Sequence, residues 1–283
     1  MFNVQLRPSV KPSMWRKMAV AAWRNPVDPQ IYARLEVDMA KALEYAERLH
    51  VASGVQVSPT HLVAKAVAVA LREYPDANAM IRWNRVRLRQ QVNLFFQVAV
   101  PGKKLDLTGA VIRDADTKPV ADIAEELKLK AAAARRGLDE DFSVARRRLD
   151  RTPSWLYRTL LRGMDSLQHT LNLDLHILGL PRDALGGAMI TSVGSMGIPE
   201  AFAPLVPFTR TPLVVSVGKV EEKPVVRHGA VVIRPMCIIC ATLDHRVFDG
   251  LLAAHVAKSV LRYLADPERR ETTARLDVQR PSD

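Results

Sequence analysis

Apolar residues follow strand-like and helix-like patterns in turn along the first part of the chain. Residues 31–39, IYARLEVDM, alternate in hydropathy as a strand does, and residues 40–50, AKALEYAERLH, form an amphipathic helical pattern. A further helix is expected to start at Ser58-Pro59 and to carry a broad apolar band that is mostly buried. These patterns predict an α/β (α+β) chain.

The middle of the chain continues the mixture without regular alternation of strand and helix. Three strands are expected in VRLRQQ, VNLFFQVAV and LTGAVIRDA, and a helix is expected to begin at Pro119 and to end at Gly137. Because this order lacks the repeated strand–helix–strand unit of the Rossmann fold, a different mixed sheet flanked by helices is expected.

Residues 142–185 have a different character. A basic amphipathic helix is expected to begin at Thr152-Pro153-Ser154, since the apolar residues share one face and the arginines lie off it. The following LNLDLHILGL fits either a strand or a continuation of this helix. The apolar positions of the expected helix are Leu160, Met164, Leu167 and Leu171.

Strands dominate after residue 186, and a helix closes the pattern. The expected strands are AMITSV, PLVVSVGKVEE, KPVVRHG and AVVIRPMCIICATL, of which the middle two are expected to form a hairpin. GLLAAHVAKSVLRYLADPE predicts the last helix, and residues 268–283 are expected to be a mobile polar tail. At the other end, residues 1–13 are expected to be an extended arm, followed by a short helix in MWRKMAVAAW.

Composition narrows the class of protein. The 283 residues are 48% hydrophobic and 25% charged, which is typical of a globular protein. No apolar run is long enough to span a bilayer, and the N-terminal stretch lacks the apolar core of a signal peptide, so a cytoplasmic location is expected. Cys237 and Cys240 lie in a β-branched strand pattern, where they would point to opposite faces, so we expect packing residues rather than a redox or metal site.

The net charge of +11 suits an anionic partner, either nucleic acid, lipid headgroups or a phosphate-bearing small molecule. The sign of the charge does not choose among them. No motif supports nucleic-acid binding, and the arginines between Arg135 and Arg162 also fit a solvated basic face.

The stretch ATLDHRVFDG, residues 241–250, carries the chemistry. A strand pattern breaks into Asp-His-Arg and ends at Asp-Gly before the last helix. His245 can take a proton as a general base, Arg246 adds positive charge, and Asp249 is placed to fix the loop or the tautomer of the ring. Gly250 lets the chain turn into the helix.

The heptad DHRVFDG resembles the Asp-His-Arg-x-x-Asp-Gly motif of the catalytic domain of 2-oxoacid dehydrogenase acyltransferases, the E2 components. Its looser form, His-x-x-x-Asp-Gly, extends to chloramphenicol acetyltransferase and to condensation domains of peptide synthetases. Further segments fall in the same order as in E2 chains: ARLEVDM, SPTHLVAKAVAVALREYPDANA, NLFFQVAV, GAVIRDADTKPVADIAEEL and GGAMITSVGSMG. The resemblance implies a single chloramphenicol acetyltransferase-like domain over residues 1–283, with an extra helical insertion at about 142–185.

The resemblance also implies roles for individual residues. His245 would be the general base that deprotonates the thiol of coenzyme A or of dihydrolipoyl, with Asp249 in the catalytic set as an organiser of the loop. Thr191, in GGAMITSVG, would stabilise the oxyanion, with Ser192 as the neighbouring alternative, and Ser192 and Arg246 would lie beside bound coenzyme A. One departure affects the lining of the channel: Pro29 is followed by Gln30, where the family often has a histidine.

Family catalytic domains form trimers whose active sites lie between subunits, so the resemblance implies a homotrimer. We expect no lipoyl or subunit-binding domain, so a lipoyl group would come from another chain, such as a lipoyl-domain protein, and an E1 component is a possible partner. Free coenzyme A or another carrier stays open as acceptor. The polar C-terminus suggests a free trimer or an assembly through other contacts.

Residues 142–185 are expected near the channel or the trimer surface, as a lid or docking helix, as a membrane-surface helix, or, as we favour, packed against their own trimer. The alternative function is a non-catalytic E2-like scaffold for dehydrogenase-complex partners. The presence of His245, Asp249 and a hydroxyl at 191 argues for the enzyme.

Overall fold

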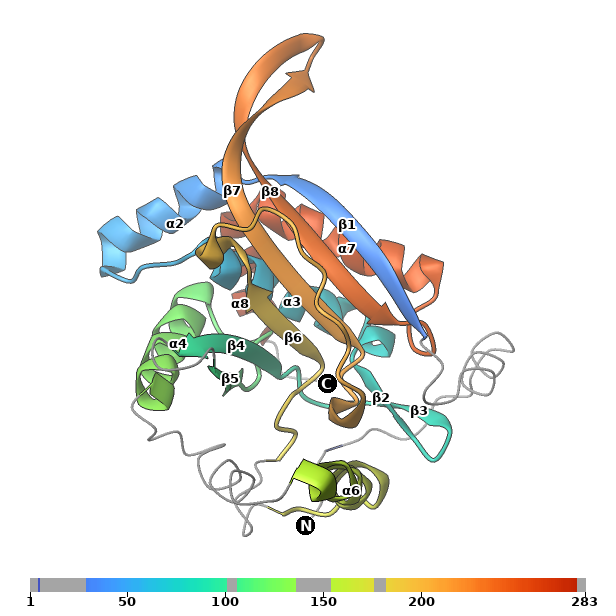
Figure 1. Cartoon of the computed structure of the whole chain (residues 1–283). Coiled ribbons are helices and arrows are strands. Elements are labelled where there is room, and N and C mark those ends of the chain that lie inside the picture. The colour runs from blue at the N-terminus through green and yellow to red at the C-terminus, as the bar shows by residue number, and fades with distance from the viewer. Residues whose placement is uncertain (1–4, 6–28, 101–105, 136–153, 176–181, 279–283) are drawn as a thin grey trace.

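Six strands form one mixed sheet at the centre of the molecule, in the order β1-β8-β7-β6-β4-β5 (Figure 1). β6 runs parallel to β4 and β7, and the other neighbours are antiparallel. The computed structural model describes residue 5 and residues 29–100, 106–135, 154–175 and 182–278. The strands of this sheet are β1 (Gln30–Asp38), β4 (Leu94–Val100), β5 (Asp106–Ile112), β6 (Ala188–Ser192), β7 (Leu213–Arg227) and β8 (Ala230–Asp244).

Helices cover one face of the sheet, which is the rear face in Figure 1. α3 and α7 pack against each other over the strands, and α2 and α4 flank them. A separate small sheet pairs β2 (Ala79–Arg82) with β3 (Arg85–Leu88). The helices are α2 (Ala40–Ser53), α3 (Pro59–Glu73), α4 (Val120–Arg135), α6 (Ser154–Asp165), α7 (Gly250–Ala265) and α8 (Pro267–Val278), and a π-helical turn, η2 (Ser166–Thr170), follows α6.

The alternation of apolar residues divides the strands between two cores. Leu94 and Phe96 of β4 join the large core under the helices, whereas Phe95 points to the opposite face. On that face Phe95 packs with Met189 and Val214, and Leu205 covers them. The sheet is therefore buried on both faces near its middle, and we call the face with Phe95 the loop face.

The start of α3 confirms the helix expected from Ser58-Pro59. The Ser58 hydroxyl accepts from the His61 backbone N–H, and His61 Nδ1 accepts from the Ser58 N–H at 3.1 Å, which makes a reciprocal capping box. Burial lowers the pKa of His61 to about 4. His61 therefore has a structural role.

The hairpin expected between PLVVSVGKVEE and KPVVRHG is wrong, because both segments belong to the single strand β7. The turn instead lies at His228 and Gly229, both with positive φ (50° and 80°), between β7 and β8. Pro224 is tolerated within β7 because the strand has passed the last residue that pairs with β6, so its missing N–H falls at a sheet edge. The outer part of this hairpin extends from the sheet (Figure 1) and exposes Val226, Val231 and Ile233.

The polar tail expected at 268–283 is also corrected, since residues 267–278 form α8. Glu271 explains why this polar segment docks: its side chain is buried and accepts a 2.7 Å hydrogen bond from the Tyr263 hydroxyl. Lys65, which is 1% exposed, lies 4.0 Å from the same carboxylate. The buried Glu271 carboxylate therefore links α8 to Tyr263 of α7 and lies beside Lys65 of α3.

The basic amphipathic helix expected after Thr152-Pro153-Ser154 is confirmed as α6 with the π turn η2. Residues 171–175 of LNLDLHILGL are neither a strand nor a helix, and contain one isolated bridge at Leu173. The expected arm at 1–13 and the expected helix in MWRKMAVAAW lie outside the described residues, apart from Gln5.

Candidate functional site

The Asp-His-Arg loop joins the end of β8 to the start of α7. Its backbone is held from both sides: the Asp244 N–H donates to Pro212 O at 2.9 Å, and the His245 N–H donates to Pro29 O at 2.8 Å. The N–H groups of Val247 and Phe248 both donate to Asp244 O. These bonds give the loop one backbone conformation and place His245 at the rim of the sheet.

The orientation of the His245 ring determines which nitrogen can act as a base. Nδ1 lies 2.8 Å from Phe248 O. Because a carbonyl only accepts, Nδ1 carries the proton in the neutral ring, and Nε2 is the basic nitrogen. The arrangement suits a general base.

The two acids of the motif have different partners. Asp244 accepts two side-chain bonds from Arg246, at 2.9 Å from Nε and 2.7 Å from Nη2. Asp249 is the N-cap of α7 and accepts from the Leu252 N–H at 2.7 Å. The tautomer of His245 is therefore set by Phe248 O, and the contact found for Asp249 is with the helix it begins.

Thr191 and Ser192 lie at the end of β6. Thr191 is on the loop face with Met189, whereas Ile190 points into the helix-covered core. Thr191 pairs with Ser216, which pairs with Cys240, four residues before the end of β8 at Asp244. At about 3.3 Å per residue this is roughly 13 Å along the sheet, besides two strand spacings. One chain alone does not bring Thr191 to His245.

A pocket of about 580 Å³ opens beside the Asp-His-Arg loop. Asp244 and Arg246, the two sequence neighbours of His245, line it, as does Gln30, the residue at the departure from the family pattern. Gln30 Oε1 also accepts from the Leu205 N–H at 2.9 Å. The other walls come from the β2–β3 hairpin, the segment 205–212 and the insertion, which contributes Asp165 and Thr170.

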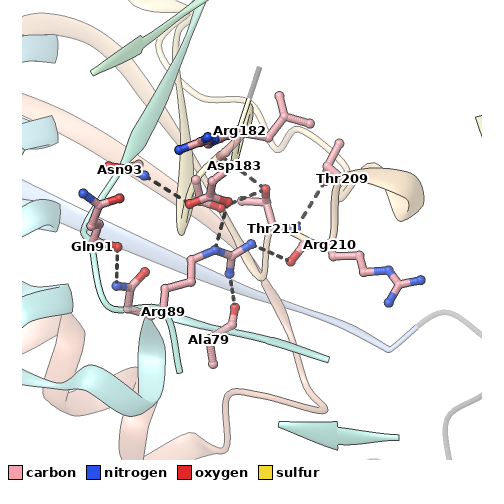
Figure 2. A network of polar contacts seen from close by, with 12 residues as sticks. Ala79, Arg89, Gln91, Asn93, Arg182, Asp183, Thr209, Arg210 and Thr211 are labelled. Carbon is pink, nitrogen blue, oxygen red and sulfur yellow. Dashed lines mark hydrogen bonds and ion pairs between the residues drawn. The ribbon is translucent and has the colours of Figure 1, made fainter. Parts of the chain in front are cut away.

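A buried polar network underlies this pocket and was not expected from the sequence (Figure 2). Arg89, 1% exposed at its side chain, lies 3.3 Å from Asp183, and Asp183 also accepts from Asn93 at 3.1 Å. Arg89 reaches the Arg210 carbonyl as well. Figure 2 shows the Arg210 side chain pointing away from this network. In the sequence, the members of this network stand out only as charged residues within apolar stretches, and that pattern does not identify their partners.

The remaining candidates are structural. Cys237 and Cys240 are both buried, and burial raises the pKa of Cys237 to about 11, as suits packing residues. His255 stacks on Tyr74 with ring centroids 5.3 Å apart. Within the described residues, His, Cys, Asp and Glu form no cluster that could hold a metal ion. In the same part of the chain, each helix is too short or too polar to cross a bilayer.

Comparisons with known proteins identify the family to which this chain is similar. The sequence model of one protein family, the 2-oxoacid dehydrogenases acyltransferase (catalytic domain), matches residues 9–141 and 181–270 of this chain. A Bacillus subtilis dihydrolipoyllysine-residue acetyltransferase component of the pyruvate dehydrogenase complex is 24% identical over 85% of this chain and 46% of its own length. A yeast dihydrolipoyllysine-residue succinyltransferase is 25% identical over 83% of this chain and 42% of its own. The chain thus spans about half the length of these relatives.

Solved structures agree on the fold. The dihydrolipoamide acetyltransferase of Azotobacter vinelandii superposes with a TM-score of 0.65 at 23% identity, covering 94% of each chain. A chloramphenicol acetyltransferase superposes with a TM-score of 0.50 at 16% identity, covering 92% of this chain and 100% of the other. The fold class and the resemblance are thereby confirmed, and the chain belongs to the family of 2-oxoacid dehydrogenase acyltransferase catalytic domains.

Proposed function

We propose that the chain catalyses acyl transfer between coenzyme A and a thiol acceptor such as dihydrolipoyl, with His245 as general base. The observation that carries this proposal is the 2.8 Å contact between His245 Nδ1 and Phe248 O, which makes Nε2 the basic nitrogen. Membership of the acyltransferase family supports it. On this proposal the chain acts as one catalytic domain.

The chemistry needs a base because a thiol is a poor nucleophile. With an ordinary pKa of about 8.5, a thiol is mostly protonated at pH 7, whereas the thiolate attacks. Nε2 of His245 accepts the thiol proton as sulfur forms a bond to the thioester carbonyl carbon. The tetrahedral intermediate then expels the coenzyme A sulfur, which takes the proton back from the imidazolium. Such a base contributes about 10²- to 10⁴-fold.

The oxyanion requires a donor, and we assign it to the Thr191 hydroxyl of a second copy, with Ser192 as the alternative. The separation of Thr191 from His245 along the sheet supports a site between subunits. The loop face also exposes large apolar side chains, among which Tyr32 and Phe202 contact edge-to-face at 5.4 Å between centroids. Such a surface suits contact between the chains of a homotrimer.

The other motif residues support this centre. Asp249 and Arg246 hold the loop through the Leu252 N–H and Asp244, and Arg246 and Ser192 are assigned to the surroundings of coenzyme A. Coenzyme A is a substrate here, and a dihydrolipoyl group is the proposed acceptor. The names of the relatives point to an oxoacid dehydrogenase complex, with an E1 or lipoyl-domain protein as partner.

The test is transfer from acetyl-CoA to dihydrolipoamide by the purified protein. His245→Ala is expected to lower kcat by about 10²- to 10⁴-fold, because the thiol loses its base. His255→Ala is the matched control: the His255 ring, on α7, stacks on Tyr74 at the end of α3, so this variant is expected to keep kcat within about twofold.

Full activity of a folded His245→Ala variant would exclude this base. Binding of dehydrogenase subunits without any turnover by the wild-type protein would support the scaffold instead.

A further inference from the structure

The insertion lies where the chain departs from its family. The family match stops at residue 141 and resumes at 181, so α6 and η2 fall outside it. Even so, Asp165 and Thr170 line the same pocket as Asp244 and Arg246. A segment outside the family match therefore lines the same pocket as the loop of the candidate base.

Arg210 attaches the insertion there. Its guanidinium donates to Asp165 Oδ1 at 2.7 Å and Oδ2 at 2.8 Å, and to Thr170 Oγ1 at 2.7 Å. It also donates to Ile81 O at 3.1 Å, which joins the insertion to the β2–β3 hairpin. Arg210 has a positive φ of 50°, an uncommon conformation for a side chain of this size that these contacts hold in place.

The same contacts set the charge of the pocket. The Arg210 guanidinium donates to both oxygens of the Asp165 carboxylate, and the Arg246 guanidinium donates to both oxygens of the Asp244 carboxylate. Burial raises the pKa of Asp165, but the bonds from His169 and Arg210 outweigh this and keep the pKa below its ordinary value. Both cations facing the pocket thus already have intramolecular anions.

Among the described residues, the remaining lining is uncharged. It combines apolar side chains with neutral polar ones, and a ligand carboxylate would have to displace a two-bond arginine–carboxylate pair to find a cation. Such a lining favours a neutral chain. The uncharged lining residues include Met80, Ile81, Leu205, Val247, Asn84 and Thr211.

We propose that the insertion, fixed by Arg210, is a specificity element that closes this pocket around an uncharged part of the substrates and disfavours carboxylate-bearing ones. This inference rests on the proposed acyl transfer and goes beyond it, since it names which substrates are selected and which residues select them. The uncharged part belongs either to the acyl group of the donor or to the arm of the acceptor.

The test is the Asp165→Asn variant, which leaves a cation at Arg210 without its carboxylate. In one arm, isobutyryl-CoA is compared with succinyl-CoA, with dihydrolipoamide as acceptor. In the other, dihydrolipoamide is compared with dihydrolipoate, with acetyl-CoA as donor. The ratio of kcat/KM is expected to shift about tenfold toward the carboxylate-bearing substrate in one arm, and that arm identifies the occupant.

Two further variants keep the test decisive. Asp174→Asn breaks a comparable pair with Arg182 in the insertion, away from the lining residues, and is expected to leave both ratios unchanged. Thr170→Val removes the third Arg210 contact with little change in volume and is expected to raise KM for the neutral substrate in the responding arm, with kcat retained.

Unchanged ratios in a folded Asp165→Asn protein, or equal shifts in Asp174→Asn, would overturn the specificity element. If transfer still depends on His245 in that case, the proposed function survives alone. Transfer that does not depend on His245 would overturn both.

Discussion

Two polar networks meet at the candidate pocket, and they are built at very different ranges along the chain. In the Asp-His-Arg loop the side-chain contacts described above are local: the His245 ring contacts Phe248 three residues away, and Arg246 pairs with Asp244 two residues away. Around Arg210 the partners Asp165 and Ile81 are 45 and 129 residues away. The side-chain contacts of the first network lie within one heptad, although its backbone is also held by Pro29 and Pro212, whereas the second network exists only in the assembled fold.

The largest effect should come from breaking the buried pair of Arg89 and Asp183, which, like the contacts of the Arg210 side chain, joins residues far apart in the sequence. Arg89→Met leaves the Asp183 carboxylate buried without its cation, so the free energy of unfolding is expected to fall by about 3–5 kcal/mol in urea denaturation. Arg48→Met, which breaks the exposed pair with Glu268, is the control and should cost less than about 1 kcal/mol. Similar losses in the two variants would contradict the importance of burial here.

The pH dependence of stability sharpens the comparison, because His61 has a local partner but a pKa set by tertiary burial. Its pKa is about 4 in the folded chain and about 6.5 in the unfolded one. As the pH falls from 6.5 to 4, the unfolded chain binds a proton that the folded chain does not, so stability decreases.

His61→Gln keeps an acceptor for the capping box and should remove on the order of 2 kcal/mol of that decrease. Urea denaturation at pH 7 and pH 4.5 measures it. Identical pH dependence in the two proteins would count against the buried neutral ring.

The smallest effect is expected from the local network. Asp249→Ala removes the cap of α7 and should cost about 1 kcal/mol, and Asp249→Ser should restore most of it through its hydroxyl. Thermal unfolding and the transfer assay are compared for both variants. A serine variant with restored stability but lost activity would show that the carboxylate takes part in the chemistry beyond capping.

The range of the contacts also explains what could be predicted from the sequence. Strands β1, β4, β5, β6 and β8 and the packing role of Cys237 follow from alternation, and the start of α3 follows from Ser58-Pro59. The position of His245 between β8 and α7 follows from the heptad DHRVFDG, because its residues are contiguous in the sequence and can be recognised together.

Other features depend on partners that a local pattern does not name. Two strands were expected where β7 is one, and β7 continues through Pro224 because the strand has one free edge there. Glu271 gave no sign that α8 would dock, since its partner Tyr263 lies on another helix. The role of Arg210 is invisible until the fold brings Asp165 to it.

The distance that one chain keeps between Thr191 and His245 has a consequence for inheritance as well as for chemistry. In a ring of identical copies, the active site at each subunit interface would take its histidine from one copy and its hydroxyl from the next. A copy with a defect at residue 191 would still supply its histidine, and a copy with a defect at residue 245 would still supply its hydroxyl. The interface that combines this histidine with this hydroxyl would then hold an intact active site. Two defective alleles would in that case compensate for each other in one assembly, which a site contained within a single chain does not allow.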